Sequence, residues 1–371
     1  MKSSILRQGH FFSLLLLSWT CCCCFFVAVH GSAPVAESPE LLEETSSETF
    51  KFVHKTVIIP HDQKKHRGGE DAAATSDQLL VVADGVGGWA NKGVNPGLYS
   101  RLLTKTIVEL FEKDKEKQSP LSLSEIVEQA NQYAASQHLG SATCTAVRLT
   151  GPNTLQTLNI GDSGYSIHRR TSSGLNVVFA SEPGQKQFNF PHQIGGKYGD
   201  VVAEVADHHT HSLQKGDILV VYSDGVSDNL HPQEYHECID RYLTADGIVV
   251  SYSLVADCIA RQAYVLGKDK QFDSPFAQGA RLVGKRYMGG KHDDITVTVA
   301  QVARSSHNDS SSKSGGSPSS APSNQPEDKD DPHYTESIFI YTGPVPSKED
   351  LPSMEEVLHR KPVSAMGEEE L

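Results

Sequence analysis

The chain has few of the cysteines that build cross-linked or thiolate-bound metal sites. Seven of its 371 residues are cysteine, and four of these, Cys21 to Cys24, fall in one apolar run near the amino terminus. Cys144, Cys238 and Cys258 have no metal-ligand spacing, which argues against a structural zinc site. We expect these three to be buried free thiols, because a large domain needs no disulfide to form its core.

Positive charge is also scarce. The 33 Lys and Arg residues are outnumbered by 46 Asp and Glu residues, which gives a formal net charge of −13. Nucleic-acid binding needs a basic surface, so this balance excludes nucleic acid as a partner. It does not exclude a phosphorylated ligand, because bound divalent cations reverse the local field.

Acidic residues, in contrast, recur at the ends of apolar runs. A carboxylate at the end of a strand is held rigidly, and Gly85 or Gly225 lets a backbone carbonyl come close to a cation. Several such carboxylates would repel one another unless a divalent metal held them together. Three runs predicted to be strands show the pattern: residues 79–83 precede Asp84, residues 218–222 precede Asp224, and residues 295–299 follow Asp293 and Asp294.

The type of ligand indicates the type of metal. Carboxylate oxygens without thiolates or paired histidines favour Mg²⁺ or Mn²⁺. Glu70 and Asp71, shortly upstream of Asp84, can complete a two-metal cluster, which clamps a phosphate ester and activates water at neutral pH. A single Asp-Gly pair is more often a turn, but its repetition at predicted strand ends favours the metal site.

These motifs, taken in order, resemble those of the metal-dependent serine/threonine phosphatases of the protein phosphatase 2C family. The sequence DGVGGW is most similar to the first motif of the short branch associated with mitochondria and plastids. The resemblance covers about residues 50–303 and implies an α+β fold, a four-layer α-β-β-α sandwich with the metals at one end. The motifs are GGED, VVADGVGG, GSATCTAVRL, LNIGDSGY, LVVYSDGVSDN and GGKHDDITVTVAQV.

The resemblance also implies roles for single residues. Asp84 resembles the aspartate that bridges both metals, and Gly85 resembles the glycine that offers its carbonyl. Asp162 resembles an aspartate that holds an extra metal or orients its loop, and Asp294 stands where many relatives have asparagine, so we expect it to orient a ligand. The other ligands implied are Asp224 and Asp293 for one ion, and Glu70 or Asp71 for the other, through water.

The implied activity is hydrolysis of phosphoserine and phosphothreonine in proteins, with two Mg²⁺ or Mn²⁺ ions and a bridging hydroxide that attacks phosphorus directly. The alternative is a pseudophosphatase that binds a phosphoprotein or regulatory partner without hydrolysis. The complete carboxylate set favours the enzyme.

Two departures from the family bear on the mechanism. Val86 stands where better-known relatives have a histidine proposed to protonate the leaving group, so that proton must come from metal-bound water or another residue. His66 stands where relatives have an arginine that holds the substrate phosphate. Its neighbours Lys65 and Arg67 can substitute, although a solvated basic loop is an equally reasonable interpretation.

Hydrophobic periodicity predicts alternating strands and helices. Helices are expected over residues 98–113, from Ser122 with a capping box to Glu125, and over 250–266. His208, His209 and His211 are predicted to lie in an exposed strand or loop rather than to bind metal. Strands are expected at 143–149, 155–160, 164–169, 175–180, 218–222 and 295–302.

Both ends of the chain differ in composition from this domain. Residues 1–31, with an apolar run over 11–29, predict a signal peptide or membrane anchor and hence the secretory route, whereas the family resemblance favours a mitochondrion or plastid. Residues 32–49 are a linker. We expect a monomer whose membrane contact, if any, involves residues 11–29.

The Ser-, Pro- and Asp-rich residues 304–371 predict a disordered tail. Within it, the apolar residues 338–341 are interpreted as an incidental patch, with docking on the domain as the alternative. A sequon begins at Asn308 and would be usable only in the endoplasmic reticulum.

Residues 182–200, rich in Gly and Pro, are predicted to form a loop that selects the substrate. Phe188, Phe190 and His192 are expected to border the cleft, because loops on a rigid scaffold commonly carry recognition. The alternative is that both rings only pin the loop to the core.

Overall fold

The computed structural model describes residues 49–197, 199–305 and 338–340. These residues belong to one compact unit that begins at Ser47. The predicted leader, most of the linker, the sequon and most of the tail lie outside them. No helix among the described residues is long and apolar enough to cross a membrane.

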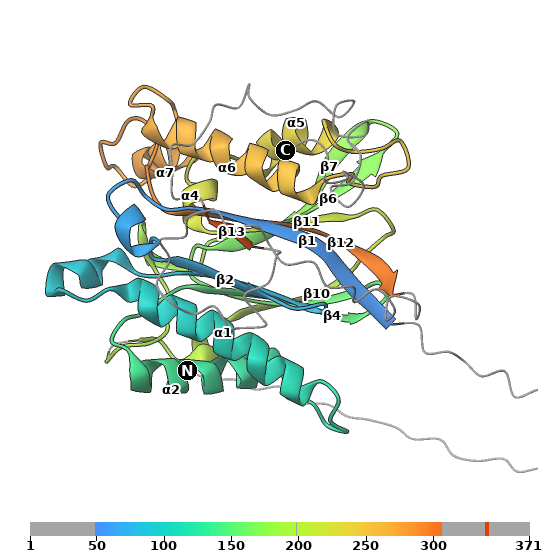
Figure 1. Ribbon diagram of the computed structural model, residues 1–371. Helices are drawn as coiled ribbons and strands as arrows, with labels where there is room; N and C mark the ends of the chain where they lie inside the picture. The colour runs from blue at the N-terminus through green and yellow to red at the C-terminus, as the bar shows by residue number, and fades with distance from the viewer. Residues whose placement is uncertain (1–48, 198, 306–337, 341–371) are drawn as a thin grey trace, which may run out of the picture. The chain divides into compact units, whose positions relative to one another are not determined.

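Two sheets stack face to face between two layers of helices (Figure 1). All pairs between neighbouring strands are antiparallel except β13 with β1. The six-stranded sheet has the order β13 (Ile338–Ile340), β1 (Thr49–Ile59), β12 (Ile295–Ser305), β11 (Ile218–Tyr222), β6 (Gly164–Thr171) and β7 (Gly174–Ala180). The five-stranded sheet has the order β10 (Asp207–Ser212), β5 (Thr154–Ile160), β4 (Cys144–Gly151), β3 (Leu79–Asp84) and β2 (Asp71–Thr75).

Each sheet has its own helical cover. Helices α1 (Pro96–Asp114) and α2 (Leu123–Gln137) cover the five-stranded sheet, while α4 (Asp224–Ser227), α5 (His236–Asp240), α6 (Tyr252–Lys268) and α7 (Pro275–Leu282) lie on the other side (Figure 1). The short elements that connect them are 3-10 helices at Lys65–Arg67, Gly87–Lys92 and Pro232–Tyr235, the strands β8 (Gln185–Gln187) and β9 (Phe190–Pro191), and α3 (Val202–Val205). This mixed α and β architecture with stacked sheets confirms the predicted fold class.

The main helices begin where the sequence places cap residues. Asn95 accepts a hydrogen bond from the backbone of Gly97, directly before Pro96 at the first position of α1. Ser122 and Glu125 form the predicted capping box at the start of α2. Ser251 caps α6. All three predicted helices are confirmed, the first and third within two residues at both ends and the second at its start.

Apolar side chains fill three layers, one between the sheets and one under each helical cover. Leu80 and Val82 of β3 face Leu219 and Val221 of β11 in the layer between the sheets. The alternate residues Leu79 and Val81 point the other way, toward α1 and α2. This alternation fixes the register of β3 and therefore the position of Asp84 at its end.

Most strand predictions are confirmed, and two segments differ from them. The loop over 182–200 contains the small β8–β9 hairpin, in which Asn189 has a positive φ of 58°. Residues 338–340 pair in parallel with Thr56, Val57 and Ile58, so the interpretation as an incidental patch is wrong for these three and the docking alternative holds. Tyr341 lies outside the described residues. The three histidines of β10 lie in an edge strand, as predicted.

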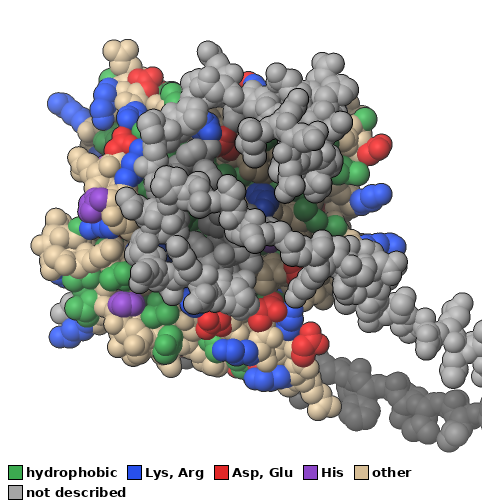
Figure 2. Space-filling model, viewed as in Figure 1, with side chains coloured by type: hydrophobic (Ala, Val, Ile, Leu, Met, Phe, Trp, Pro, Cys, Tyr) green, Lys and Arg blue, Asp and Glu red, His purple; other side chains and the backbone are tan. Residues whose placement is uncertain are grey.

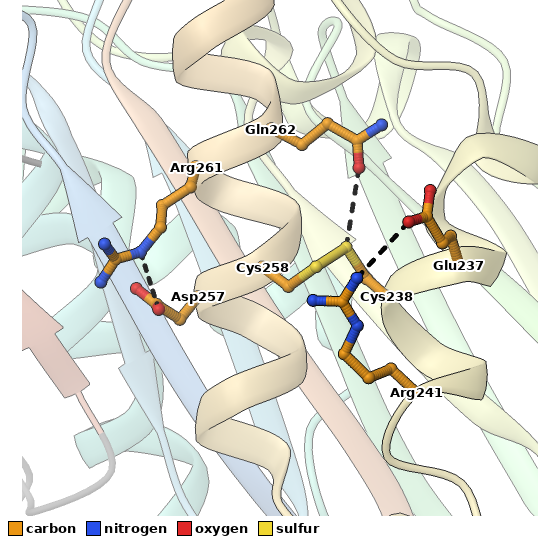
Figure 3. The surroundings of a disulfide bond; sticks show 7 residues. All are labelled: Glu237, Cys238, Arg241, Asp257, Cys258, Arg261 and Gln262. Atoms are coloured by element: carbon orange, nitrogen blue, oxygen red, sulfur yellow. Dashed lines mark hydrogen bonds and ion pairs between the residues drawn. A yellow bond between two sulfur atoms is a disulfide. The ribbon is translucent and has the colours of Figure 1, made fainter. Parts of the chain in front are cut away.

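The prediction of three free thiols is wrong for two of them. Cys238 of α5 and Cys258 of α6 form a buried disulfide with a Cα–Cα separation of 5.7 Å (Figure 3). Asp257 and Arg261, one turn apart on α6, form a buried ion pair at 2.8 Å close to it (Figure 3). The pairing depends on how α5 packs on α6, and a separation of 20 residues carries no local sign of it. Cys144 is free and buried, as expected.

Candidate active site

Carboxylates from both sheets gather at one end of the sandwich. Asp71 opens β2 directly opposite Asp84, which ends β3. Asp224 follows β11 as the first residue of α4, and Asp293 and Asp294 directly precede β12. A hydrogen bond of 2.7 Å from Thr296 of β12 to Asp71 joins the two sheets at this point. The strand-end positions that the sequence motifs indicate are therefore brought together in space.

Two glycines let the backbones approach closely around these acids. A Cβ on Gly85 would lie 2.7 Å from the Glu70 carbonyl oxygen and 3.1 Å from the Pro96 carbonyl carbon. A Cβ on Gly225 would collide with the Asp294 carbonyl oxygen. Larger residues at either position would push Asp84 or Asp224 away from the other acids, which explains the Asp-Gly pairs in steric terms.

Lys64 contacts three acids of the site. Its ammonium lies 2.7 Å from Glu70 Oε2, 2.9 Å from Asp294 Oδ2 and 3.3 Å from Asp293 Oδ1. Asp294 also accepts hydrogen bonds from the backbone N–H groups of His61 and Glu70. Asp294 is therefore the buried anchor that fixes Glu70 and Lys64 in place.

Lys291 also contacts three acids. Its ammonium lies 2.5 Å from Asp224 Oδ2, 2.5 Å from Asp228 Oδ2 and 3.5 Å from Asp293 Oδ2. The sequence motifs did not point to Asp228, Lys291 or Lys64. A signal for Asp228 was available, because residues four apart in a helix share a face, and Asp228 comes four residues after Asp224.

Crowding of the acids shifts their pKa values. Loss of hydration raises the pKa of Asp84 well above its usual range, and the nearby charges of Asp71, Asp224 and Asp293 raise it further. Burial likewise raises the pKa of Asp71 to about 8. Asp293 behaves differently: burial acts to raise its pKa, but Lys291 and Lys64 outweigh burial and lower it.

Asp162 lies beside this group, in the loop before β6. Gln185 of β8 donates a hydrogen bond of 3.0 Å to Asp162 Oδ2. Burial raises the pKa of Asp162 to about 7, and the charge of Asp224 acts in the same direction. Asp162 therefore faces Asp224 on one side and the base of the 182–200 loop on the other.

The donor set fits a hard divalent cation. Within the described residues, Asp71 Oδ1, Asp162 Oδ1 and Asp224 Oδ1 are buried without a hydrogen-bond partner. Buried carboxylate oxygens are costly unless something positive contacts them. In the described part of the chain, no three acidic, His or Cys side chains lie close enough together to enclose an ion. The ammonium groups of Lys64 and Lys291 supply the positive charge among the acids.

Comparison with known proteins agrees with this geometry. A family model described as protein phosphatase 2C matches residues 64–247. Probable protein phosphatase 2C 1 of Oryza sativa subsp. japonica is 34% identical over 267 residues, which cover 67% of this chain and 74% of that protein. This chain belongs to the protein phosphatase 2C family.

Two further relatives show how far the likeness extends. Probable protein phosphatase 2C 55 of Arabidopsis thaliana is 34% identical over 271 residues, which cover 72% of this chain but 55% of that protein. The X-ray structure of the photosystem II phosphatase PBCP is 31% identical, with a TM-score of 0.59, and the match covers 67% of this chain and 98% of that one. The chain thus spans little more than half of some curated relatives and nearly the whole of the solved phosphatase 2C domain.

The three basic residues predicted to hold the substrate phosphate differ in their contacts in this phosphatase 2C domain. Lys65 pairs with Asp62 at 3.0 Å, and His66 is exposed. Arg67 contacts an acid of the site, through a bond of 2.7 Å from its Nη2 to Glu70 Oε1. Arg67 and Lys64 thus both contact Glu70.

The predicted substrate loop, residues 182–200, contacts the site through Gln185 near its start. Phe188 packs against Phe276 of α7 with ring centroids 4.9 Å apart, whereas Phe190 is 45% exposed. His192 is partly buried and contacts Asp200 at 3.3 Å. The loop thus carries one packed ring and one exposed ring, and both their place at the border of a cleft and their role in recognition stay predictions.

Proposed function

We propose that this chain hydrolyses phosphoserine and phosphothreonine in proteins, with Mg²⁺ or Mn²⁺ as cofactor. Members of the family depend on these metals. The observation that carries the proposal is the set of buried strand-end carboxylates, of which three have an oxygen without a hydrogen-bond partner among the described residues.

Two ions would be held by the acids that the motifs single out. Asp84 would contact both ions, with the Gly85 carbonyl beside it. Asp224 and Asp293 would hold one ion, and Glu70 or Asp71 the other, while Asp162 would hold an extra ion or orient its loop. Bound Mg²⁺ or Mn²⁺ would provide an activated water as nucleophile and neutralise the phosphate charge.

The remaining polar residues position this set. Asp294 fixes Glu70 through its backbone N–H and holds Lys64 through a charge-assisted bond. Arg67 keeps one guanidinium bond to Glu70, and its planar fork has further N–H groups that suit a phosphate face. We assign the phosphate-holding role to Arg67 with Lys64, rather than to Lys65 or His66.

A phosphoprotein is the substrate class that this assignment implies. PBCP is named a photosystem II phosphatase, and that likeness favours a plastid for this chain. The predicted leader favours the secretory route instead, and the buried disulfide fits a compartment where disulfides persist. Imaging of a carboxy-terminally tagged chain, with amino-terminal sequencing of its mature form, distinguishes the two.

The proposal is tested with a phosphopeptide and controlled metal. Activity should require added Mg²⁺ or Mn²⁺, disappear with a chelator, return when metal is restored, and survive inhibitors of other phosphatase classes. Full turnover after exhaustive removal of metal would overturn the proposal. Tight phosphopeptide binding without turnover at any metal concentration would favour the non-hydrolytic binding module, which no feature of the described site supports.

A further inference from the structure

The end of α7 and the loop after it form a continuously exposed stretch, residues 281–288. All eight residues are exposed, and none is acidic. Leu282 is 89% and Met288 76% exposed, and Val283 and Tyr287 are also exposed. Basic residues are interleaved with them: Arg281, Lys285 and Arg286.

This combination is unusual for a chain with a net charge of −13. Large apolar side chains grouped at the surface mark interaction sites more often than scattered ones do. Arg281 is already held by Asp273, at 2.6 and 3.0 Å. Arg286, in contrast, forms no ion pair with any described residue. The surface therefore offers uncommitted positive charge beside apolar side chains, and Figure 2 shows Lys and Arg side chains at the edge of the molecule over α7.

The segment is joined to the carboxylate cluster through Phe276. The backbone N–H of Phe276 donates to the Asp228 carbonyl oxygen at 3.0 Å, and the Lys291 ammonium lies 5.2 Å from the centre of its ring. Tyr287 of the segment packs on the same ring, with centroids 4.7 Å apart. The exposed stretch and the acids of the site thus share one aromatic contact.

The distance along the chain is short as well. Met288 comes five residues before Asp293, and five extended residues span at most about 17 Å. A peptide whose phosphate lies at the cluster can therefore reach this surface within about five residues of its phosphorylated side chain.

We propose that residues 281–288 dock the substrate, and that the preferred substrate carries an acidic and a large apolar side chain within about five residues of the phosphoresidue. The inference rests on the proposed phosphatase function and specifies its substrate class. Arg286 and Lys285 would meet the acidic side chain, and Leu282 and Met288 the apolar one. The opposite charge steers the substrate to the site, and the apolar contact holds it there.

The test uses two phosphopeptides, one with acidic and apolar flanks and one with basic flanks, together with a small aryl phosphate. For the double variant Arg286→Glu and Met288→Ser, kcat/KM on the acidic peptide should fall about tenfold, a loss typical of a docking contact. Its rate on the aryl phosphate should change less than about twofold, because that substrate does not reach the segment. The basic peptide should become a better substrate for the variant than for the parent chain.

A matched control carries the same changes at the opposite end of β11. Lys215 and Ile248 are exposed, and they adjoin Gly216 and Gly247, whose backbones contact each other near the start of β11. The variant Lys215→Glu with Ile248→Ser should behave like the parent chain on all three substrates.

Equal losses on both peptides, or no loss, would overturn the docking proposal while leaving the phosphatase assignment intact. A gain of activity on the acidic peptide would overturn it too, because the segment would then hold an inhibitory acidic part of the chain. A parent chain that hydrolyses neither phosphopeptide nor the aryl phosphate with added Mg²⁺ or Mn²⁺ would instead refute the proposed function.

Discussion

The carboxylate cluster and the 281–288 segment are neighbours along the chain but differ in almost every physical property. The cluster is buried, acidic and fixed at the ends of β2, β3, β11 and β12. The segment is exposed, basic and apolar, and it comprises the end of α7 and the loop after it. Chemistry that needs fixed charges requires rigid elements, whereas the recognition proposed for the segment must adapt to a partner and suits a loop.

The largest effect should come from Asp84, the acid that we propose contacts both ions. Replacing Asp84 by Asn should lower kcat/KM about 1,000-fold on every substrate, because Asp84 would serve both ions and its loss would remove several kcal/mol of charge stabilisation. Replacing Asp294 by Asn should cost about 10- to 100-fold, since Asp294 acts by holding Glu70 and Lys64. Steady-state kinetics on a phosphopeptide and an aryl phosphate check both values.

Thermal unfolding of the Asp84 and Asp294 variants distinguishes a positioning role from a direct catalytic role. Asp294 accepts two backbone bonds, so its replacement should also lower Tm, whereas Asp84→Asn should leave the metal-free protein as stable or more stable. Equal rates for the two variants would refute the division of roles between them.

A smaller effect should appear in the stability of the chelated protein between pH 6.5 and 8. The pKa values of Asp162 and Asp71 are raised to about 7 and about 8, so the folded state keeps protons that the unfolded state has released. Stability therefore falls as pH rises through this range, by on the order of 1 kcal/mol per pH unit. Histidines do not oppose the trend, because those with lowered pKa values, such as His168, change their contribution to stability only below about pH 6.5.

Tm measured against pH checks this prediction. The slope should weaken in Asp162→Asn, which carries no charge at any pH, and it should weaken again when Mg²⁺ replaces the protons in the parent chain. A Tm that stays constant or rises from pH 6.5 to 8 would contradict the sign of the effect.

The contrast between the two regions also explains what the sequence could reveal. Asp84, Asp224 and Asp293 could be predicted because each follows or precedes an apolar run, and alternation along such a run fixes where its end points. The helix caps at Asn95 and Ser122 are equally local signals, although only the second was predicted. Local chemistry and periodicity are thus readable from the sequence alone.

Features that depend on packing between segments distant along the chain could not be predicted from the sequence. The Cys238–Cys258 bond follows from the contact of α5 with α6, and the pairing of β13 with β1 joins residues that lie far apart along the chain. Lys64 and Lys291 looked like ordinary surface charges, because their acidic partners converge on them from other strands. Neither composition nor spacing records such convergence.

The smallest predicted effect distinguishes the two rings of the 182–200 loop. Phe190 is exposed, so Phe190→Ala should lower kcat/KM on a phosphoprotein about threefold without changing Tm, while the rate on an aryl phosphate stays nearly constant. Phe188 is packed on Phe276 and Gly279, so Phe188→Ala should lower Tm as well, because it leaves a gap under the loop. Through Phe276, that gap also reaches the contact with Tyr287, so Phe188→Ala should weaken the preference for the acidic phosphopeptide. Parallel losses on the phosphoprotein and the aryl phosphate in both variants would show that the loop only supports the fold, and would leave residues 281–288 as the sole recognition surface proposed beside the cluster.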